Sequence, residues 1–475
     1  MLTIFWMMGI CTIILFYNDT YLPVLSSVII FIVVACYLVW LYQRKKTGPL
    51  MLLVFLVYSL PFIHIIPYIW FDYNNPPNKM WGLATNPYMF DQTIIELMSM
   101  IGAVGSIGLI IGISYSSLKL RTNVKKNSYQ IVNKIQTLPM SFFLAWVFIG
   151  VIFSWLFAPE QTIFKAVYTQ SKAVSDNWNF GSIWMFSYAF LAFAFADSLF
   201  EKSKNIRIIK KKVIVYSILF VVMWLQLLRG DRESLPFVMG CILVRFAWGN
   251  NLKFLKKINW QKVLSWILII FFVSYIVGVL RSTMVDKDIF MITTIVEEDI
   301  KNDESGISSL MNGTWSGALL SPLSISGDYI NNALAIKYGQ TYIDLLISII
   351  PGFIADWIGY ARPIDGWRGP AWEMRYGIGG THAVVVPFMN FRIIGVFSII
   401  LFWSFILAKM ELKVKKSSNV IDLSFLVIIT TALPHWLWYG EKNIINSLII
   451  WLILSFFYRL CISNKVRNYF GSEIH

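Results

Sequence analysis

The sequence predicts an all-α polytopic membrane protein with about twelve transmembrane helices, both termini in the cytoplasm and one large loop on the outer side. Three observations lead to this fold class. The chain of 475 residues is 57% hydrophobic and only 14% charged, with a mean hydropathy of +0.64. Apolar runs of membrane-spanning length recur along it, and the loops between them alternate in charge. A soluble protein of this size cannot bury so much apolar surface.

A window of about 19 residues divides the chain into predicted spans. The first apolar run lacks a preceding charged segment and a small-residue cleavage site, so we expect a membrane helix rather than a signal peptide. The seventh and eighth runs are short and flank Arg229, a pattern that also fits a broken or re-entrant hairpin. The predicted spans are 2–17, 24–42, 50–71, 95–117, 140–158, 182–200, 213–228, 235–248, 263–281, 390–408, 421–439 and 444–462.

Basic residues gather in every second loop, for example in Arg44-Lys45-Lys46 and from Lys202 to Lys212. Because cytoplasmic loops are enriched in lysine and arginine, this alternation places both termini in the cytoplasm. The predicted regions are 1–281 with transmembrane helices 1–9, 282–389 as the large outer loop, and 390–475 with helices 10–12 and a cytoplasmic tail. Within the loop, a Gly/Ser-rich part near 313–327 precedes the apolar segment 342–360, where we expect interfacial or re-entrant helices.

Lysine and arginine are distributed differently across this topology. Of 27 lysines, 20 fall on or near the inner side, whereas 7 of 13 arginines fall on or near the outer side. Arginine offers a planar fork that binds phosphate or carboxylate bidentately, which the compact lysine ammonium does not. The asymmetry therefore indicates that the outer arginines bind a ligand. They are Arg229, Arg232, Arg281, Arg362, Arg368, Arg375 and Arg392.

The first arginine cluster is Arg229-Gly230-Asp231-Arg232-Glu233, between two apolar runs. Arg229 and Arg232 are three residues apart and share a face if this turn is helical. One interpretation is a local ion-pair cluster that caps the hairpin. The other is a pyrophosphate clamp in which Asp231 and Glu233 orient the arginines, and the cost of placing ionisable groups near a membrane favours such a function.

The second cluster extends from Arg362 to Arg375 and interleaves arginine with tryptophan among glycines and prolines. Tryptophan at a membrane interface often acts as an anchor. Indole faces also stack on sugars and hold arginine by cation–π contact, so a carbohydrate or lipid-headgroup site is the alternative. The candidate binding residues are Arg362, Trp367, Arg368, Trp372, Glu373 and Arg375.

His382 follows Gly379-Gly380-Thr381 at the boundary between the outer loop and the next apolar run. A histidine there can take a proton from a hydroxyl at neutral pH, which makes it a candidate catalytic base. The alternative is a residue at a helix N-terminus without a catalytic role.

No sequence motif requires a metal ion, a nucleotide or another cofactor. The sequence has no Walker loop, HExxH or GxSxG motif, and its four cysteines lie in or beside apolar runs without metal-site spacing. The net charge of +14 is concentrated in short loops that set the topology, so we expect contact with membrane lipids and not with nucleic acid. The energy for any reaction would then come from the substrate, such as a lipid diphosphate leaving group.

Arg229 and Arg368 are each followed eleven positions later by a glycine, Gly240 and Gly379. With the twelve predicted spans, the cytoplasmic termini and the late outer loop, these Arg-x10-Gly segments resemble the Wzy-type O-antigen and oligosaccharide repeat-unit polymerases of Gram-negative inner membranes. The resemblance covers most of the chain. The related O-antigen ligases have a large periplasmic loop with arginines and a histidine regarded as the base, and His382 is the matching position here.

The resemblance implies a multi-pass glycosyltransferase of the bacterial inner membrane whose active site faces the periplasm. It would transfer a growing glycan from undecaprenyl diphosphate to a new lipid-linked repeat unit, with a Wzz-type chain-length-regulating co-polymerase as partner. Arg229 and Arg232, helped by Arg368 or Arg375, would bind the diphosphate and stabilise its departure. His382 would activate the acceptor hydroxyl, and the cluster tryptophans would pack on sugar.

Three other functions are compatible with the sequence. An O-antigen ligase would join the same donor to lipid A core, and a deletion strain would then lack capped core altogether instead of retaining one repeat. A lipid-linked oligosaccharide flippase would suit twelve spans, although such transporters usually show two similar halves. A non-catalytic scaffold would have ion-paired arginines and a loop that binds a partner. Normal polymerisation after replacement of all outer arginines would favour the last two.

Overall fold

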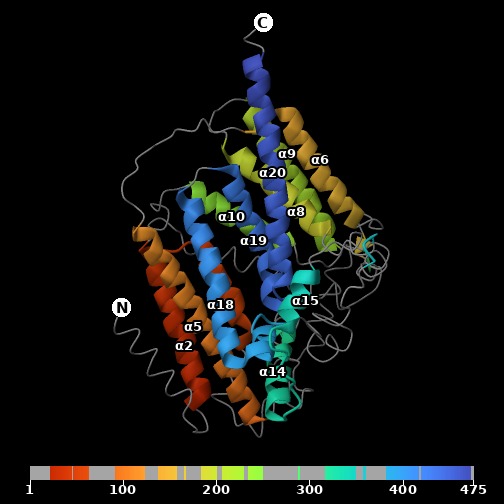
Figure 1. The fold of residues 1–475 in the computed structure, drawn as a ribbon. Helices are drawn as coiled ribbons and strands as arrows, with labels where there is room; N and C mark the ends of the chain where they lie inside the picture. Colours follow the sequence, from red (N-terminus) through yellow and green to blue (C-terminus); the bar gives the residue numbers. More distant parts are fainter. Residues whose placement is uncertain are drawn as a thin grey trace. The chain divides into compact units, whose positions relative to one another are not determined.

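The computed structural model describes residues 22–44, 46–63, 91–122, 137–157, 165–166, 183–200, 206–228, 234–249, 287–288, 316–348, 357–359, 381–416 and 419–471. These residues form twelve helices and one sheet of two short strands (Figure 1). Five of the described helices are long and apolar enough to cross a membrane, and four more are shorter apolar helices. The predicted all-helical, membrane-type architecture is confirmed at this level.

The first of two compact units comprises residues 1–125, 303–412 and 434–442. It contains three helices from the first quarter of the chain and three from the later part. They are α2 (Leu22–Gln43), α3 (Pro49–Ile63), α5 (Gln92–Thr122), α14 (Ser316–Ile330), α15 (Gln340–Ser348) and α18 (Val385–Lys416) as far as Leu412.

Glycines on one face of α5 allow α18 to approach its backbone closely. A Cβ atom on Gly108 would lie 2.6 Å from the carbonyl oxygen of Phe397, and one on Gly112 would overlap the Ser404 hydroxyl. The two glycines are spaced as G-x-x-x-G, the pattern that brings helix backbones together in membranes. Because both residue numbers rise together along the contact, α5 and α18 run parallel.

The start of α3 is capped by a side chain that lies far away in the sequence. Both carboxylate oxygens of Glu411, near the end of α18, accept hydrogen bonds from the backbone N–H groups of Gly48 (2.9 Å) and Leu50 (2.7 Å). The first N–H groups of a helix have no partner within the helix, and buried donors without acceptors are destabilising. A Cβ on Gly48 would overlap this carboxylate, so a larger residue there would displace the cap.

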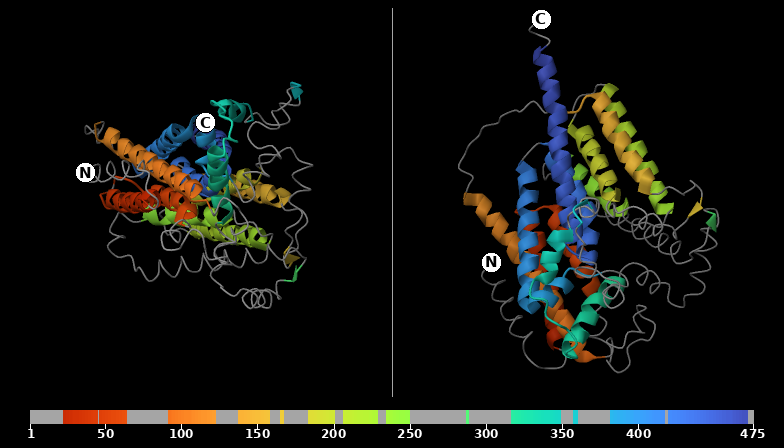
Figure 2. Two further views of the ribbon diagram at one scale, coloured as in Figure 1. Left: turned by 90° about the horizontal axis from the view of Figure 1, so that it is seen from below. Right: turned by 45° about the vertical axis from the view of Figure 1, so that its right-hand side comes forward.

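The second unit comprises residues 126–302, 413–433 and 443–475. Helices α6 and α8 lie side by side in both views (Figures 1 and 2). The unit contains α6 (Met140–Phe157), β1 (Lys165–Ala166), α8 (Ile183–Phe200), α9 (Ile206–Leu228), α10 (Ser234–Gly249), β2 (Lys287–Asp288), most of α19 (Val420–Tyr439) and α20 (Lys442–Gly471) from its second residue.

Contacts fix the helix directions within this unit. Leu138 contacts Asp197 at one end of the α6–α8 pair, and Gly150 packs on Leu191 further along, so the two helices are antiparallel. Ser447 and Tyr458 of α20 contact Met185 and Asp197 of α8, so these two helices run parallel. The strands β1 and β2 pair in antiparallel register.

Large apolar side chains remain exposed along the outer faces of the helices. Phe148 and Phe220 of the second unit are 64% and 61% exposed, and Ile394 of the first is 76% exposed. An open groove of about 570 Å³ between α6 and α9, lined by apolar side chains, continues this surface. Soluble proteins rarely expose so much apolar surface, whereas lipid chains would cover it.

Ten predicted spans overlap described helices, while 2–17 and 263–281 lie outside the described residues. Two boundaries differ from the prediction. The Gly/Ser-rich part of the outer loop belongs largely to α14, which contains Pro322 within the helix. Helix α18 begins at Val385, inside the predicted loop 282–389, and is interrupted by non-helical backbone at Phe391 and Arg392.

Candidate functional site

Most of the predicted site lies outside the described residues. Of the candidate catalytic and binding residues, His382 has a described position. The other members remain predictions: Arg229, Asp231, Arg232, Arg362, Trp367, Arg368, Trp372, Glu373 and Arg375. Gly240 of the first Arg-x10-Gly segment lies in α10, where a Cβ would come within 3.0 Å of Thr430 and of the Val427 carbonyl oxygen. Close helix packing therefore explains that glycine.

The imidazole of His382 is completely buried in the first unit. It packs against Tyr58 and Phe62, with ring centroids at 5.2 and 5.0 Å. Its Nε2 lies 3.2 Å from the Tyr58 carbonyl oxygen, and its Nδ1 accepts a bond from the Val384 N–H at 3.4 Å. A ring that donates from Nε2 and accepts at Nδ1 is the neutral tautomer.

This environment suits a structural role for His382. Burial lowers the pKa of the imidazole to about 3, with the bond to the Tyr58 carbonyl acting in the opposite direction. Both ring nitrogens are in hydrogen bonds, and the backbone N–H donates to Ser321 Oγ at 2.9 Å. The residue thus links α3, α14 and the start of α18. Its predicted role as a base stays a prediction that no feature of this geometry supports.

Arg392 occupies a break within α18. Its φ of 56° and ψ of −146° lie in a region that non-glycine residues rarely adopt, at a cost of about 1–3 kcal/mol. The guanidinium lies 4.6 Å from the Tyr329 ring centroid and 5.7 Å from that of Phe388, and Nη2 donates to the Leu334 carbonyl oxygen at 3.3 Å. Its Nη1 is buried without a hydrogen-bond acceptor among the described residues.

The amide of Asn390 fastens α15 to the same break. Its Oδ1 accepts a bond from the Gly339 N–H at 2.8 Å, and its Nδ2 donates to Thr341 Oγ1 at 2.6 Å and to the Val386 carbonyl oxygen at 2.8 Å. Gly339 has a φ of 87°, a left-handed conformation that suits glycine at this turn. These bonds fix the first turn of α15 and therefore the position of Tyr342.

Glu441 lies in the tight turn between α19 and α20. Gly440, with a φ of 92°, ends α19 and donates its N–H to the Trp436 carbonyl oxygen at 3.0 Å, as in left-handed helix caps. Glu441 is only 1% exposed. The Tyr342 hydroxyl donates to its Oε1 at 3.3 Å, whereas its Oε2 is buried without a partner among the described residues.

The carboxyl group of Glu441 is therefore poorly stabilised as an anion. Burial raises its pKa to about 7, although a backbone hydrogen bond of its own residue and the Tyr342 hydroxyl oppose that change. Burial and the neighbouring Glu441 also raise the pKa of Tyr342, which keeps that phenol protonated. A carboxyl group that changes charge near neutral pH is suited to proton transfer.

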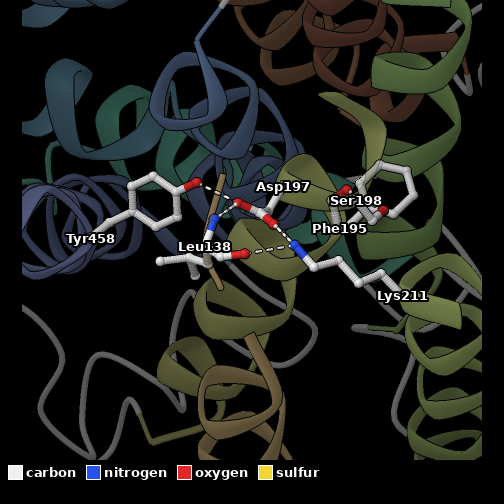
Figure 3. A network of polar contacts seen from close by, with 6 residues as sticks. All are labelled: Leu138, Phe195, Asp197, Ser198, Lys211 and Tyr458. Atoms are coloured by element: carbon white, nitrogen blue, oxygen red, sulfur yellow. Dashed lines mark hydrogen bonds and ion pairs between the residues drawn. The ribbon is translucent and has the colours of Figure 1, made fainter. Parts of the chain in front are cut away.

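A second polar centre joins residues of α8, α9 and α20 to the segment just before α6 in the second unit (Figure 3). Asp197 Oδ2 pairs with Lys211 Nζ at 3.0 Å, and Oδ1 accepts bonds from the Leu138 N–H at 2.9 Å and the Tyr458 hydroxyl at 2.5 Å. Lys211 also donates to the Leu138 carbonyl oxygen at 2.7 Å. Both oxygens of Asp197 are in use, so this centre is a structural clamp and leaves no acceptor for a substrate.

Three comparisons bear on the site and the fold. No protein-family model, no curated protein and no solved structure matches this chain. Among the residues that the structure describes, no group of three or more His, Cys, Asp or Glu side chains could hold a metal ion.

Sequence reasoning assigned no role to Glu441 and included Arg392 only in the set of outer arginines. A signal for Glu441 was present, because it is an acidic residue in a very short turn between two long apolar runs. Its hydrogen-bond donor Tyr342 lies in α15, which belongs to the predicted outer loop. The break at Arg392 has no sequence signal that we recognise.

Proposed function

We propose that this protein is a glycosyltransferase of the bacterial inner membrane. It polymerises oligosaccharide repeat units that are linked to undecaprenyl diphosphate, and it does so on the periplasmic face. The observation that carries the proposal is Arg392, a strained arginine whose Nη1 is buried without an acceptor among the described residues. By the predicted topology it lies on the outer side, where arginine is enriched and lysine is not.

A phosphate group would resolve the unfavourable features of Arg392. Guanidinium groups bind phosphate oxygens through short, charge-assisted hydrogen bonds. Backbone strain and buried donors without acceptors are costly, and they concentrate at ligand sites. The aromatic rings of Tyr329 and Phe388 hold the guanidinium in place while leaving Nη1 for a ligand.

The predicted arginine clusters would complete the donor site. Arg229 and Arg232, with Arg368 or Arg375, would bind the diphosphate and stabilise the charge that develops as it leaves. Trp367 and Trp372 would pack on the sugars. The substrate supplies the energy of transfer through its diphosphate leaving group, so the reaction requires no nucleotide.

The test is polymerisation by purified protein in lipid nanodiscs. We expect a ladder of products from a lipid-diphosphate-linked repeat unit without added metal or nucleotide. Replacing Arg392 with glycine relieves the backbone strain, which offsets the loss of its contacts with Tyr329, Phe388 and Leu334, and the variant should bind the donor at least tenfold more weakly. Arg459→Gly in α20, on the predicted inner side, is the control for loss of an arginine.

Two outcomes would contradict the proposal. A wild-type protein that is folded and binds the donor but yields no polymer is not a polymerase. Equal donor affinity of the Arg392→Gly variant and the wild type would show that this guanidinium does not bind phosphate. In cells, Arg229→Ala at normal protein level should leave single capped repeats instead of polymer.

A further inference from the structure

We propose that Glu441 is the proton acceptor of the transfer reaction and that the acceptor sugar reaches it through the Tyr342 hydroxyl. The inference rests on the proposed function and names the group that activates the acceptor. It assigns to Glu441 the role that the sequence suggested for His382. Three features carry it: an enclosed carboxylate that is poorly stabilised as an anion, a phenol hydrogen-bonded to it, and the stacking of that phenol on Phe391.

The carboxylate of Glu441 is poorly stabilised as an anion and can therefore take up a proton. Glu441 Oε2 has no hydrogen-bond partner among the described residues, and the residue is 1% exposed. An enclosed carboxylate without a cation is less stable than the neutral acid, so it accepts a proton readily. Such an ionisable group at the end of a membrane helix is expected to be functional unless it is paired.

Tyr342 connects this enclosed carboxylate to the surface. Its hydroxyl donates to Glu441 Oε1 at 3.3 Å, and its side chain is partly exposed. Its ring lies parallel to that of Phe391, with centroids 6.3 Å apart, and Phe391 is 43% exposed. Aromatic faces of this kind stack on the C–H surfaces of sugars, which would bring an acceptor hydroxyl to the phenol.

Other ionisable groups near Glu441 do not take this role. Among the described side chains, Tyr342 donates a hydrogen bond to the Glu441 carboxylate. His382 has both ring nitrogens in hydrogen bonds, and the guanidinium of Arg392 is a donor only. In α15, in residues 381–392 and in residues 434–442, the described ionisable side chains besides Glu441 are Tyr342, Asp344, His382, Arg392, His435 and Lys442.

The proposed step conserves atoms and electrons. The acceptor hydroxyl passes its proton to Tyr342 Oη while the Tyr342 proton moves to Glu441 Oε1. The acceptor oxygen forms a bond to the anomeric carbon, and the bond between that carbon and the phosphate oxygen breaks. The bonding electron pair leaves with the lipid diphosphate. Glu441 later releases the proton to water, which restores the starting state.

The experiment compares the pH dependence of kcat for the full-length protein and two variants in nanodiscs, with a lipid-diphosphate-linked repeat unit as substrate. In the wild type, kcat should rise with pH to a plateau, with a midpoint near 7 set by the pKa of Glu441. Glu441→Gln and Tyr342→Phe should each lower kcat by about 10²–10⁴-fold and remove this rise. Donor affinity should stay within about twofold of the wild type, since neither residue binds the diphosphate.

Two substitutions of the same type control for nonspecific effects. Glu96→Gln removes a charge from α5, where Gln92 is its hydrogen-bond partner, and Tyr37→Phe removes a buried hydroxyl in α2 without a partner among the described residues. Both should retain the rise with pH.

Infrared difference spectroscopy provides a measurement that does not depend on turnover. A protonated carboxyl band should titrate near pH 7 in the wild type and be missing in Glu441→Gln. A wild-type kcat and pH profile in Glu441→Gln, with the polymer still formed, would overturn this inference while leaving the proposed function intact. A wild type that binds donor but forms no polymer would overturn both.

Discussion

Replacing Glu441 with glutamine should change the free energy of unfolding differently at pH 4 and pH 8. The difference between the variant and the wild type should be more favourable to the variant at pH 8 than at pH 4. The substitution preserves the size of the side chain and an oxygen that can accept the Tyr342 bond. It removes a group that must become charged in a buried site as the pH rises. Burying the additional amide has its own cost, but that cost does not change with pH.

The magnitude follows from the pKa of Glu441, which burial raises from 4.5 to about 7. Below pH 4.5 the folded and unfolded chains both carry the proton. Between 4.5 and 7 the unfolded chain releases it while the folded protein retains it, so the free energy of unfolding falls as the pH rises. Above pH 7 the loss is complete and amounts to about 3 kcal/mol.

The assay is reversible unfolding in mixed micelles, followed by tryptophan fluorescence at pH 4 and pH 8. The free-energy difference between Glu441→Gln and the wild type should shift by about 3 kcal/mol in favour of the variant at the higher pH. Asp344→Asn in α15 is the control for the loss of a carboxylate. An identical difference at both pH values would refute the reasoning, because the folded carboxyl would then titrate like an ordinary one.

Three further predictions concern the buried ion pair, the helix cap and the helix packing described above. Asp197→Asn should lower the free energy of unfolding by about 3–5 kcal/mol, because the ammonium of Lys211 stays buried without this carboxylate. Recovery of stability in the Asp197→Asn, Lys211→Met double variant would support the clamp. A near-zero effect of the single change on the free energy of unfolding would exclude it. Glu411→Ala should cost at least about 2 kcal/mol in chemical denaturation, because two backbone donors at the start of α3 lose their acceptor. Gly112→Ala should lower the melting temperature more than Gly150→Ala, because the first Cβ would meet backbone atoms and the second would meet movable side chains; equal effects would contradict the close α5–α18 approach.

Helix positions were predictable from the sequence because their signal is local. A run such as that of α2 is apolar throughout its length, and no soluble structure accommodates it easily. The α5–α18 contact also had a sequence signal in Gly108 and Gly112, which our sequence interpretation did not use. The helix α14 was harder to predict, since its serines, glycines and Pro322 are residues that usually favour loops.

The candidate site was less predictable because it depends on contacts between distant segments. Whether a histidine at a helix start is free or enclosed is decided by Tyr58 and Phe62, which are more than 300 positions earlier in the chain. Likewise, Glu441 is distinguished from an ordinary turn residue by its burial and by its hydrogen bond with Tyr342, 99 positions earlier in the chain. The arginine clusters around Arg229 and Arg368 lie outside the described residues, so their proposed roles still rest on the sequence.

The cap on α3 has a consequence for the order in which the protein is made. Helix α3 is synthesised early, but the carboxylate that satisfies its first N–H groups follows 361 residues after Leu50. At about 5–20 residues per second, that interval is about 20–70 s of translation. During it, the start of α3 must rely on water or lipid headgroups, so a ribosome that stops before residue 411 releases a chain in which α3 lacks this cap.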